Sequence, residues 1–174
     1  MSGALADIAR AIAESRAHDV VVHLLSNVPG LPPIVQTVHL LAIATVMGSI
    51  VVICLKMLGL ALPSQSTEEL VRRLLPWTWS ALPVLLASGL VFVIARPRRY
   101  FSNPVFGLKL ALIAFAILMA SVLHVIARRS PGRWDTAAGR RGAKLMAGVS
   151  LAAWVSIVLA GRWIAYADYL FPEE

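Results

Sequence analysis

Four ionisable side chains lie within stretches of the sequence that are otherwise apolar: His39, Lys109, His124 and Arg162. Neutral imidazole is a common axial ligand of haem iron. Lysine and arginine side chains neutralise the carboxylates of such a cofactor, which matters in an apolar site because unpaired buried charge is costly. An ionisable residue within an apolar span is therefore a functional candidate from the start. We predict a cofactor site built on His39, which is the residue expected to bind the metal.

The depth of each residue in its apolar stretch decides which of them can meet. At about 1.5 Å per helical residue, His39, Lys109 and Arg162 fall within roughly 8 to 14 Å of the same end of the helices. These three can share one site. His124 lies roughly 30 Å from that end, in the opposite layer near Trp79, and roughly 20 Å from His39 along the axis. One haem cannot easily take both histidines, so His124 is either a ligand in a separate layer or a residue that links helices by hydrogen bonds.

A further imidazole, His23, precedes the first apolar stretch. It reaches His39 if the chain after Asp19 folds back over the outer face. Lys109 is the other candidate for the sixth position of the iron, or else a charge partner of the cofactor. Plain structural explanations exist for each residue, since a histidine can link helices and a lysine or arginine near the interface can extend to water or phosphate. The sequence leaves these alternatives open.

The elements that must position these residues are long apolar stretches. The chain has 59% hydrophobic and 14% charged residues and a mean hydropathy of +0.77, far outside the range of soluble proteins. Four stretches are long enough to cross about 30 Å of hydrocarbon as helices: residues 34–62, 74–95, 104–127 and 144–171. Short loops make consecutive helices antiparallel neighbours. We predict an all-α integral membrane protein, an up-down bundle of four transmembrane helices in contact with the lipid bilayer.

The N-terminal segment has a different character. Residues 1–16 place apolar and charged side chains at helical spacing, which predicts an amphipathic helix that lies on the membrane. Residues 19–33 are rich in proline and glycine and predict an irregular or partly helical re-entry into the first span. A cleaved signal peptide is not expected, because no basic region is followed by an uninterrupted apolar run. We divide the chain into an interfacial segment, residues 1–33, and a transmembrane domain, residues 34–174.

Basic residues are distributed unevenly between the loops. The connections between the first and second spans and between the third and fourth spans carry most of them, and such loops usually face the cytoplasm. This predicts a multi-pass protein of the bacterial inner membrane with both termini in the periplasm. The net charge of +7 does not indicate nucleic acid as a partner, because the basic residues form short clusters between apolar runs. The only cysteine, Cys54, lies in a span, which excludes a disulfide framework.

Two motifs resemble those of a known type of membrane protein. The first span contains Thr37-Val38-His39-Leu40-Leu41 and ends in Leu55-Lys56-Met57-Leu58-Gly59, and the third opens with Asn103-Pro104-Val105-Phe106-Gly107-Leu108-Lys109. This pattern resembles a bacterial family of uncharacterised four-helix membrane proteins. In that family a histidine starts the first span, an Asp-Leu-Arg-Leu-Leu-Gly stretch ends it, and an Asn-Pro-x-Phe-x-x-Lys stretch opens the third. The resemblance covers most of residues 33–166, although Cys54 and Lys56 replace the aspartate and the arginine.

The chain is also similar, more distantly, to HemJ-type protoporphyrinogen oxidases and CopD-like membrane domains. In HemJ-type proteins an early histidine and a later lysine are associated with b-type haem, which the resemblance carries over to His39 and Lys109. We therefore expect a haem b protein that transfers electrons, between quinone and a partner at the outer face. The alternative is a non-catalytic accessory subunit of a larger membrane complex. A transporter is less favoured, because no inverted repeat is visible and no carboxylate lies deep inside a span, where it could serve proton coupling.

Overall fold

The computed structural model describes residues 3–130, 132, 134 and 136–166. Within this part of the chain the regular elements are all helices: α1 (Gly3–Ala13), α2 (Arg16–Asn27), α3 (Leu31–Leu58), α4 (Thr67–Ala95), α5 (Pro97–Phe101), α6 (Pro104–Arg129) and α7 (Ala137–Ala165). The helices α3, α4, α6 and α7 are long and apolar enough to cross a membrane. The prediction of an all-α chain with four spans is confirmed, and the chain is a multi-pass membrane protein.

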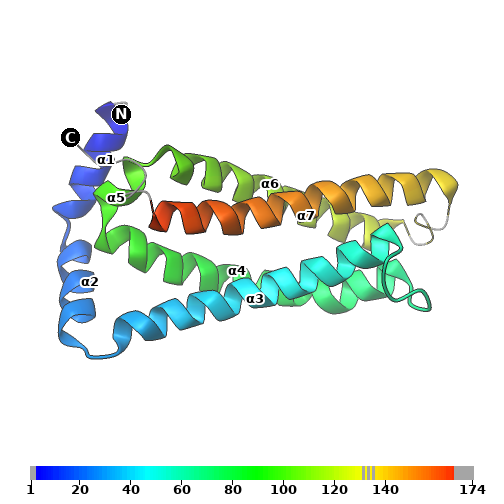
Figure 1. Ribbon diagram of the computed structural model, residues 1–174, viewed down its shortest axis with the longest axis horizontal. Coiled ribbons are helices and arrows are strands. Elements are labelled where there is room, and N and C mark those ends of the chain that lie inside the picture. The colour runs from blue at the N-terminus through cyan, green and yellow to red at the C-terminus, as the bar shows by residue number, and fades with distance from the viewer. Residues whose placement is uncertain (1–2, 131, 133, 135, 167–174) are drawn as a thin grey trace.

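The four long helices run side by side along the length of the molecule (Figure 1). Contacts between α3 and α4, α4 and α6, α6 and α7, and α7 and α3 close a ring. The α3–α4 and α6–α7 connections lie at one end, which we call the loop end, whereas α1, α2 and α5 lie at the other, the capped end. Short connections thus produce the up-down order that the sequence predicts.

Local capping signals set the ends of the first two spans. The helix α3 begins at Leu31, with prolines in its first turn, and ends before Gly59, whose φ of 80° is a left-handed conformation that glycine adopts without strain. The span therefore stops at Leu58 rather than at residue 62. The helix α4 begins at Thr67 rather than at residue 74, because the side chain of Ser66 accepts a hydrogen bond from the backbone N–H of Glu69.

The last span also begins earlier than predicted because of a capping side chain. The helix α7 begins at Ala137, seven residues before the predicted start at residue 144, because the hydroxyl of Thr136 caps it through the backbone N–H of Gly139, 3.0 Å away. Polar and basic residues fill these added turns, so hydropathy alone did not include them. The predicted end of this span, Phe171, lies outside the described residues.

Small side chains allow the last two spans to pack closely. Ala116 and Ala120 of α6 and Ala143 and Ala147 of α7 are all buried, and the two helices are in contact. Helices in lipid gain little from the hydrophobic effect and associate mainly through close packing of this kind. Large leucine and valine side chains on the outward faces remain exposed, as suits a surface that meets lipid.

The N-terminal helices cover one end of the bundle. The helix α1 packs against α5, and α2 packs against α4, so that together they lie across the capped end (Figure 1). The imidazole Nδ1 of His18 lies 2.7 Å from the carbonyl oxygen of Ile94 near the end of α4. The stretch predicted to be irregular or partly helical is helical as far as Asn27, and the next helix starts at Leu31.

Candidate functional site

The first element of the candidate site is a contact between His39 of α3 and Ser88 of α4. The imidazole Nδ1 of His39 lies 2.7 Å from the hydroxyl oxygen of Ser88. Ser88 is buried, and His39 is half-buried. Because α3 and α4 are antiparallel, residues 49 positions apart in the sequence meet at the same level, roughly 12 Å from the start of α3 and 10 Å from the end of α4.

The hydrogen bonds of Ser88 indicate which tautomer of His39 is present. The Ser88 hydroxyl donates to the carbonyl of Val84, one turn earlier in α4. A hydroxyl carries one proton, so its oxygen acts as the acceptor toward the imidazole. We therefore assign the hydrogen of the neutral ring to Nδ1, which donates to Ser88 and leaves the lone pair on Nε2. A histidine that binds a metal through one nitrogen is commonly held in this way through the other.

Two neighbours on α4 complete the surroundings of the imidazole. The ring of Phe92 meets it edge to face, with the centroids 5.9 Å apart and an angle of 89° between the planes. A Cβ atom at position 89 would lie 3.7 Å from Cε1 of His39, which is ordinary van der Waals contact, so the ring lies directly over Gly89. Ser88, Gly89 and Phe92 thus form one face of α4 that holds the ring in a defined orientation.

Lys109 of α6 approaches the same level from the other side of the bundle. Its half-buried ammonium group interacts electrostatically with His39. A Cβ atom at position 161 would lie only 3.2 Å from Lys109 Nζ, so the amine lies against the bare backbone of Gly161 in α7. Among the described residues, Lys109 has no hydrogen-bonding or ion-pair partner. An unpaired cation within a span is costly, and an anionic or lone-pair ligand would reduce that cost.

The motif that precedes Lys109 sets its position. The buried side chain of Asn103 accepts a hydrogen bond of 2.9 Å from the backbone N–H of Val105, and Pro104 occupies the first turn of α6. The ring of Phe106 packs against Tyr100 and Phe101 of α5, at centroid distances of 5.3 and 5.7 Å. The start of α6 is thereby fixed, and Lys109 follows about 8 Å along the helix.

Arg162 has the predicted depth, but it does not join His39 and Lys109. It follows Gly161 directly, and its exposed side chain lies over the ring of Tyr166, with 4.9 Å from Cζ to the ring centroid. One of its nitrogens also donates a hydrogen bond of 2.9 Å to the hydroxyl of Tyr166. The structure brings His39 and Lys109 to one level, whereas Arg162 points away from them, because α7 turns Gly161 inward and Arg162 outward.

The remaining two candidates lie apart from this pair. The ring of His124 meets that of Trp79 edge to face, 6.5 Å between centroids, in the layer toward the loop end. The exposed side chain of His23 lies 3.0 Å, through Nδ1, from the side-chain nitrogen of Asn27 on the same helix. Neither contact involves His39. In the part of the chain that the structure describes, no three His, Cys, Asp or Glu side chains are grouped to hold a metal ion.

Two residues near the site were missed from the sequence. Ser88 looked like a small polar residue in an apolar run, and only its level opposite His39 gives it a role. His18 lies in the interfacial segment, where a polar residue is unremarkable, yet it joins α2 to Ile94, six residues beyond Ser88. The antiparallel pairing of α3 and α4 is the signal that could have located Ser88.

Comparison with known proteins places the transmembrane part of the chain in one family. A family of unknown function, DUF6644, has a model that matches residues 31–167. The chain belongs to the DUF6644 family. The matched region runs from the start of α3 to just past α7, so it contains the whole bundle with His39, Ser88 and Lys109. No curated protein and no solved structure matches the chain. The likeness to HemJ-type and CopD-like proteins therefore stays a prediction.

Proposed function

We propose that this DUF6644 protein binds a b-type haem in the capped half of its bundle and takes part in electron transfer. The observation that carries the proposal is the bond between His39 Nδ1 and Ser88 Oγ, since it leaves the Nε2 lone pair free. A single well-oriented imidazole is sufficient as an axial ligand. Bound haem would supply a one-electron redox centre.

Lys109 has two candidate roles in this proposal. Its amine is either a second ligand of the iron or a charge partner of a haem propionate, and its lack of a partner among the described residues is compatible with both. The lysine lies roughly 8 Å from the capped end of α6, within reach of that interface. Arg162 is exposed on α7, so it could serve as a charge partner only for a propionate at the rim of the site.

The same proposal includes the surroundings of the protein. We infer a bacterial inner membrane with the loop end in the cytoplasm, because Arg72, Arg73, Arg128, Arg129, Arg140, Arg141 and Lys144 gather at that end. The capped end then faces the periplasm. Quinone dissolved in the bilayer and a redox partner at the capped end are the proposed donor and acceptor.

The decisive experiment is a visible spectrum of the purified protein, first oxidised and then reduced with dithionite. We expect a Soret band and sharp α and β bands on reduction. His39→Ala should abolish these bands in a protein that still inserts and elutes as a folded particle. His124→Ala is the matched control, because His124 lies in the other layer against Trp79, and it should retain the bands.

The two roles of Lys109 are separated by a second pair of variants. Lys109→Arg keeps the positive charge but cannot bind iron, whereas Lys109→Ala removes both functions. A change of spin state in both variants identifies Lys109 as a ligand, and weaker haem retention in Lys109→Ala alone identifies a charge partner. A colourless parent protein, or an unchanged spectrum in His39→Ala, would refute the proposal and favour an accessory subunit of a larger membrane complex.

A further inference from the structure

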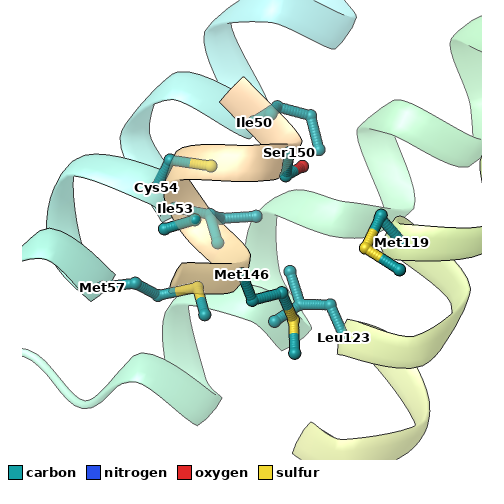
Figure 2. Close-up of a pocket in the computed structure, with 9 residues that line it drawn as sticks. Ile50, Ile53, Cys54, Met57, Met119, Leu123, Met146 and Ser150 are labelled. Carbon is teal, nitrogen blue, oxygen red and sulfur yellow. The ribbon is translucent and has the colours of Figure 1, made fainter. Parts of the chain in front are cut away.

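A second group of side chains lies around a small cavity between α3, α6 and α7 (Figure 2). The cavity has a volume of about 10 Å³, which is room for about one water molecule and excludes any organic ligand. Cys54 borders it, 15 residues after His39 and so roughly 22 Å further toward the loop end. The cavity is therefore separate from the proposed haem site.

Sulfur is concentrated at this cavity. The chain contains five methionines and one cysteine, and four of these six residues line the cavity: Cys54 and Met57 from α3, Met119 from α6 and Met146 from α7. Figure 2 shows these side chains around the cavity, on three helices. The other lining residues are Ile50, Ile53, Leu123, Ala147 and Ser150, so no carboxylate or imidazole competes with the sulfur atoms there.

Thiolate and thioether sulfur are soft donors, and among biological metals they favour Cu(I). The cavity has the size of an ion rather than of a cofactor. One thiolate would balance the single positive charge of Cu(I), so the complex would be neutral, as a site in a span requires. Ser150 lines the same cavity as Cys54, and both residues are buried.

We propose that Cys54, Met57, Met119 and Met146 form a binding site for one monovalent soft metal ion, Cu(I). On binding, the S–H bond of Cys54 breaks, a bond from its Sγ to copper forms, and the proton passes to water. The copper remains Cu(I) throughout, so no electron is transferred. The thioethers of Met57, Met119 and Met146 supply neutral donors and lose no proton.

Methionine also fills cores without binding anything, because its thioether is flexible and polarisable. That explanation and the metal site differ in what they predict for the purified protein. In the experiment, protein in detergent is titrated anaerobically with Cu(I) against the chelator bathocuproine disulfonate. The site predicts one tightly held Cu(I) per chain and an X-ray absorption spectrum with sulfur neighbours. If the methionines only fill the core, the chelator should retain all the copper.

Variants test the individual donors. Cys54→Ala should lower the affinity for Cu(I) at least tenfold, and Met119→Leu, which conserves side-chain volume, should lower it severalfold. Met47→Leu is the matched control, because Met47 lies in α3 beside the core but does not line the cavity. It should leave the affinity unchanged. Failure of the parent chain to bind Cu(I), or equal losses in Met47→Leu and Met119→Leu, would overturn the assignment.

The outcome is independent of the proposed haem site. Cys54→Ala leaves His39, Ser88 and Lys109 intact, so its reduced spectrum should equal that of the parent. His39→Ala, in turn, should bind Cu(I) as the parent does. A protein that binds copper without haem, or haem without copper, would therefore refute one proposal and leave the other standing.

Discussion

Lys109 Nζ lies 3.2 Å from the point at which a Cβ atom of residue 161 would be placed, so the amine occupies space that only Gly161 leaves free. Neither residue explains the other in the sequence, since one opens the third span and the other is near the end of the fourth. Their contact shows that α6 and α7 bring an unpaired cation and a bare stretch of backbone to the level of His39.

Gly161→Ala should displace the amine of Lys109 by a few tenths of an ångström, because a contact of 3.2 Å is too close for a methyl group. We expect weaker haem retention or a shifted spin state in the reduced and oxidised spectra. Gly148→Ala on the same helix is the control, since a Cβ atom there meets nothing within 4 Å. It should leave the spectrum alone and stabilise α7 by up to about 1 kcal/mol. Identical spectra for both variants would contradict the role of Gly161.

Ser88→Ala should leave Nδ1 of His39 without its acceptor. An unsatisfied group of this kind costs about 1 to 3 kcal/mol of stability, and loss of a partner that orients a metal ligand typically lowers metal affinity about 10- to 100-fold. Haem titration and thermal unfolding measure the two effects. Ser121→Ala provides the comparison, because the hydroxyl of Ser121 bonds only to the carbonyl of Ile117 in its own helix. If Ser88→Ala behaves like Ser121→Ala, the orientation of His39 does not depend on Ser88.

His18→Ala should loosen α2 from the capped end, because it removes the bond between the imidazole and the carbonyl of Ile94. A neutral hydrogen bond contributes about 0.5 to 1.5 kcal/mol, so backbone amides of α2 should exchange with deuterium roughly 2- to 13-fold faster. Those of α3 to α7 should be unchanged. His23→Ala is matched to it, since His23 bonds only within α2, and equal acceleration in both variants would argue against the tether.

The orientation of the chain is tested by labelling single cysteines in a Cys54→Ala background. Gln65→Cys lies in the exposed α3–α4 connection at the loop end, and Glu14→Cys lies exposed at the capped end. An impermeant maleimide added to cells with a permeabilised outer membrane should label residue 14 and not residue 65. The reverse pattern would invert the proposed topology and place the site of His39 near the cytoplasm.

Apolar length and helical rise were sufficient to predict the spans and the depth of the polar residues. The pairing of His39 with Lys109 at one level follows from 1.5 Å per residue. What the sequence does not supply is the rotation of each helix about its axis. The helix α3 is apolar on all sides, so no periodic pattern marks its inner face. For the same reason Gly161 and Arg162, neighbours in sequence and equal in depth, were not distinguished.

The helix ends show a related limit. Hydropathy located the apolar centre of each span, but Ser66 and Thr136 extend α4 and α7 into polar sequence by capping them. The caps are visible in the sequence as Ser or Thr before a helical stretch, and they become decisive only once the helix is known to continue. Ser88 was missed for another reason, because its role depends on a contact with His39, which lies 49 positions away in the sequence.

The contact of His18 with Ile94 joins positions 76 apart in the sequence, and it has a consequence for the order of assembly. During synthesis, α2 emerges long before α4 is complete. Its partner reaches the capped end only after the chain has crossed the membrane and returned. The helix α2 therefore stays undocked at the capped end until both α3 and α4 are inserted in the membrane. Docking of α2 through His18 and Ile94 can therefore occur only after the first two spans are in place.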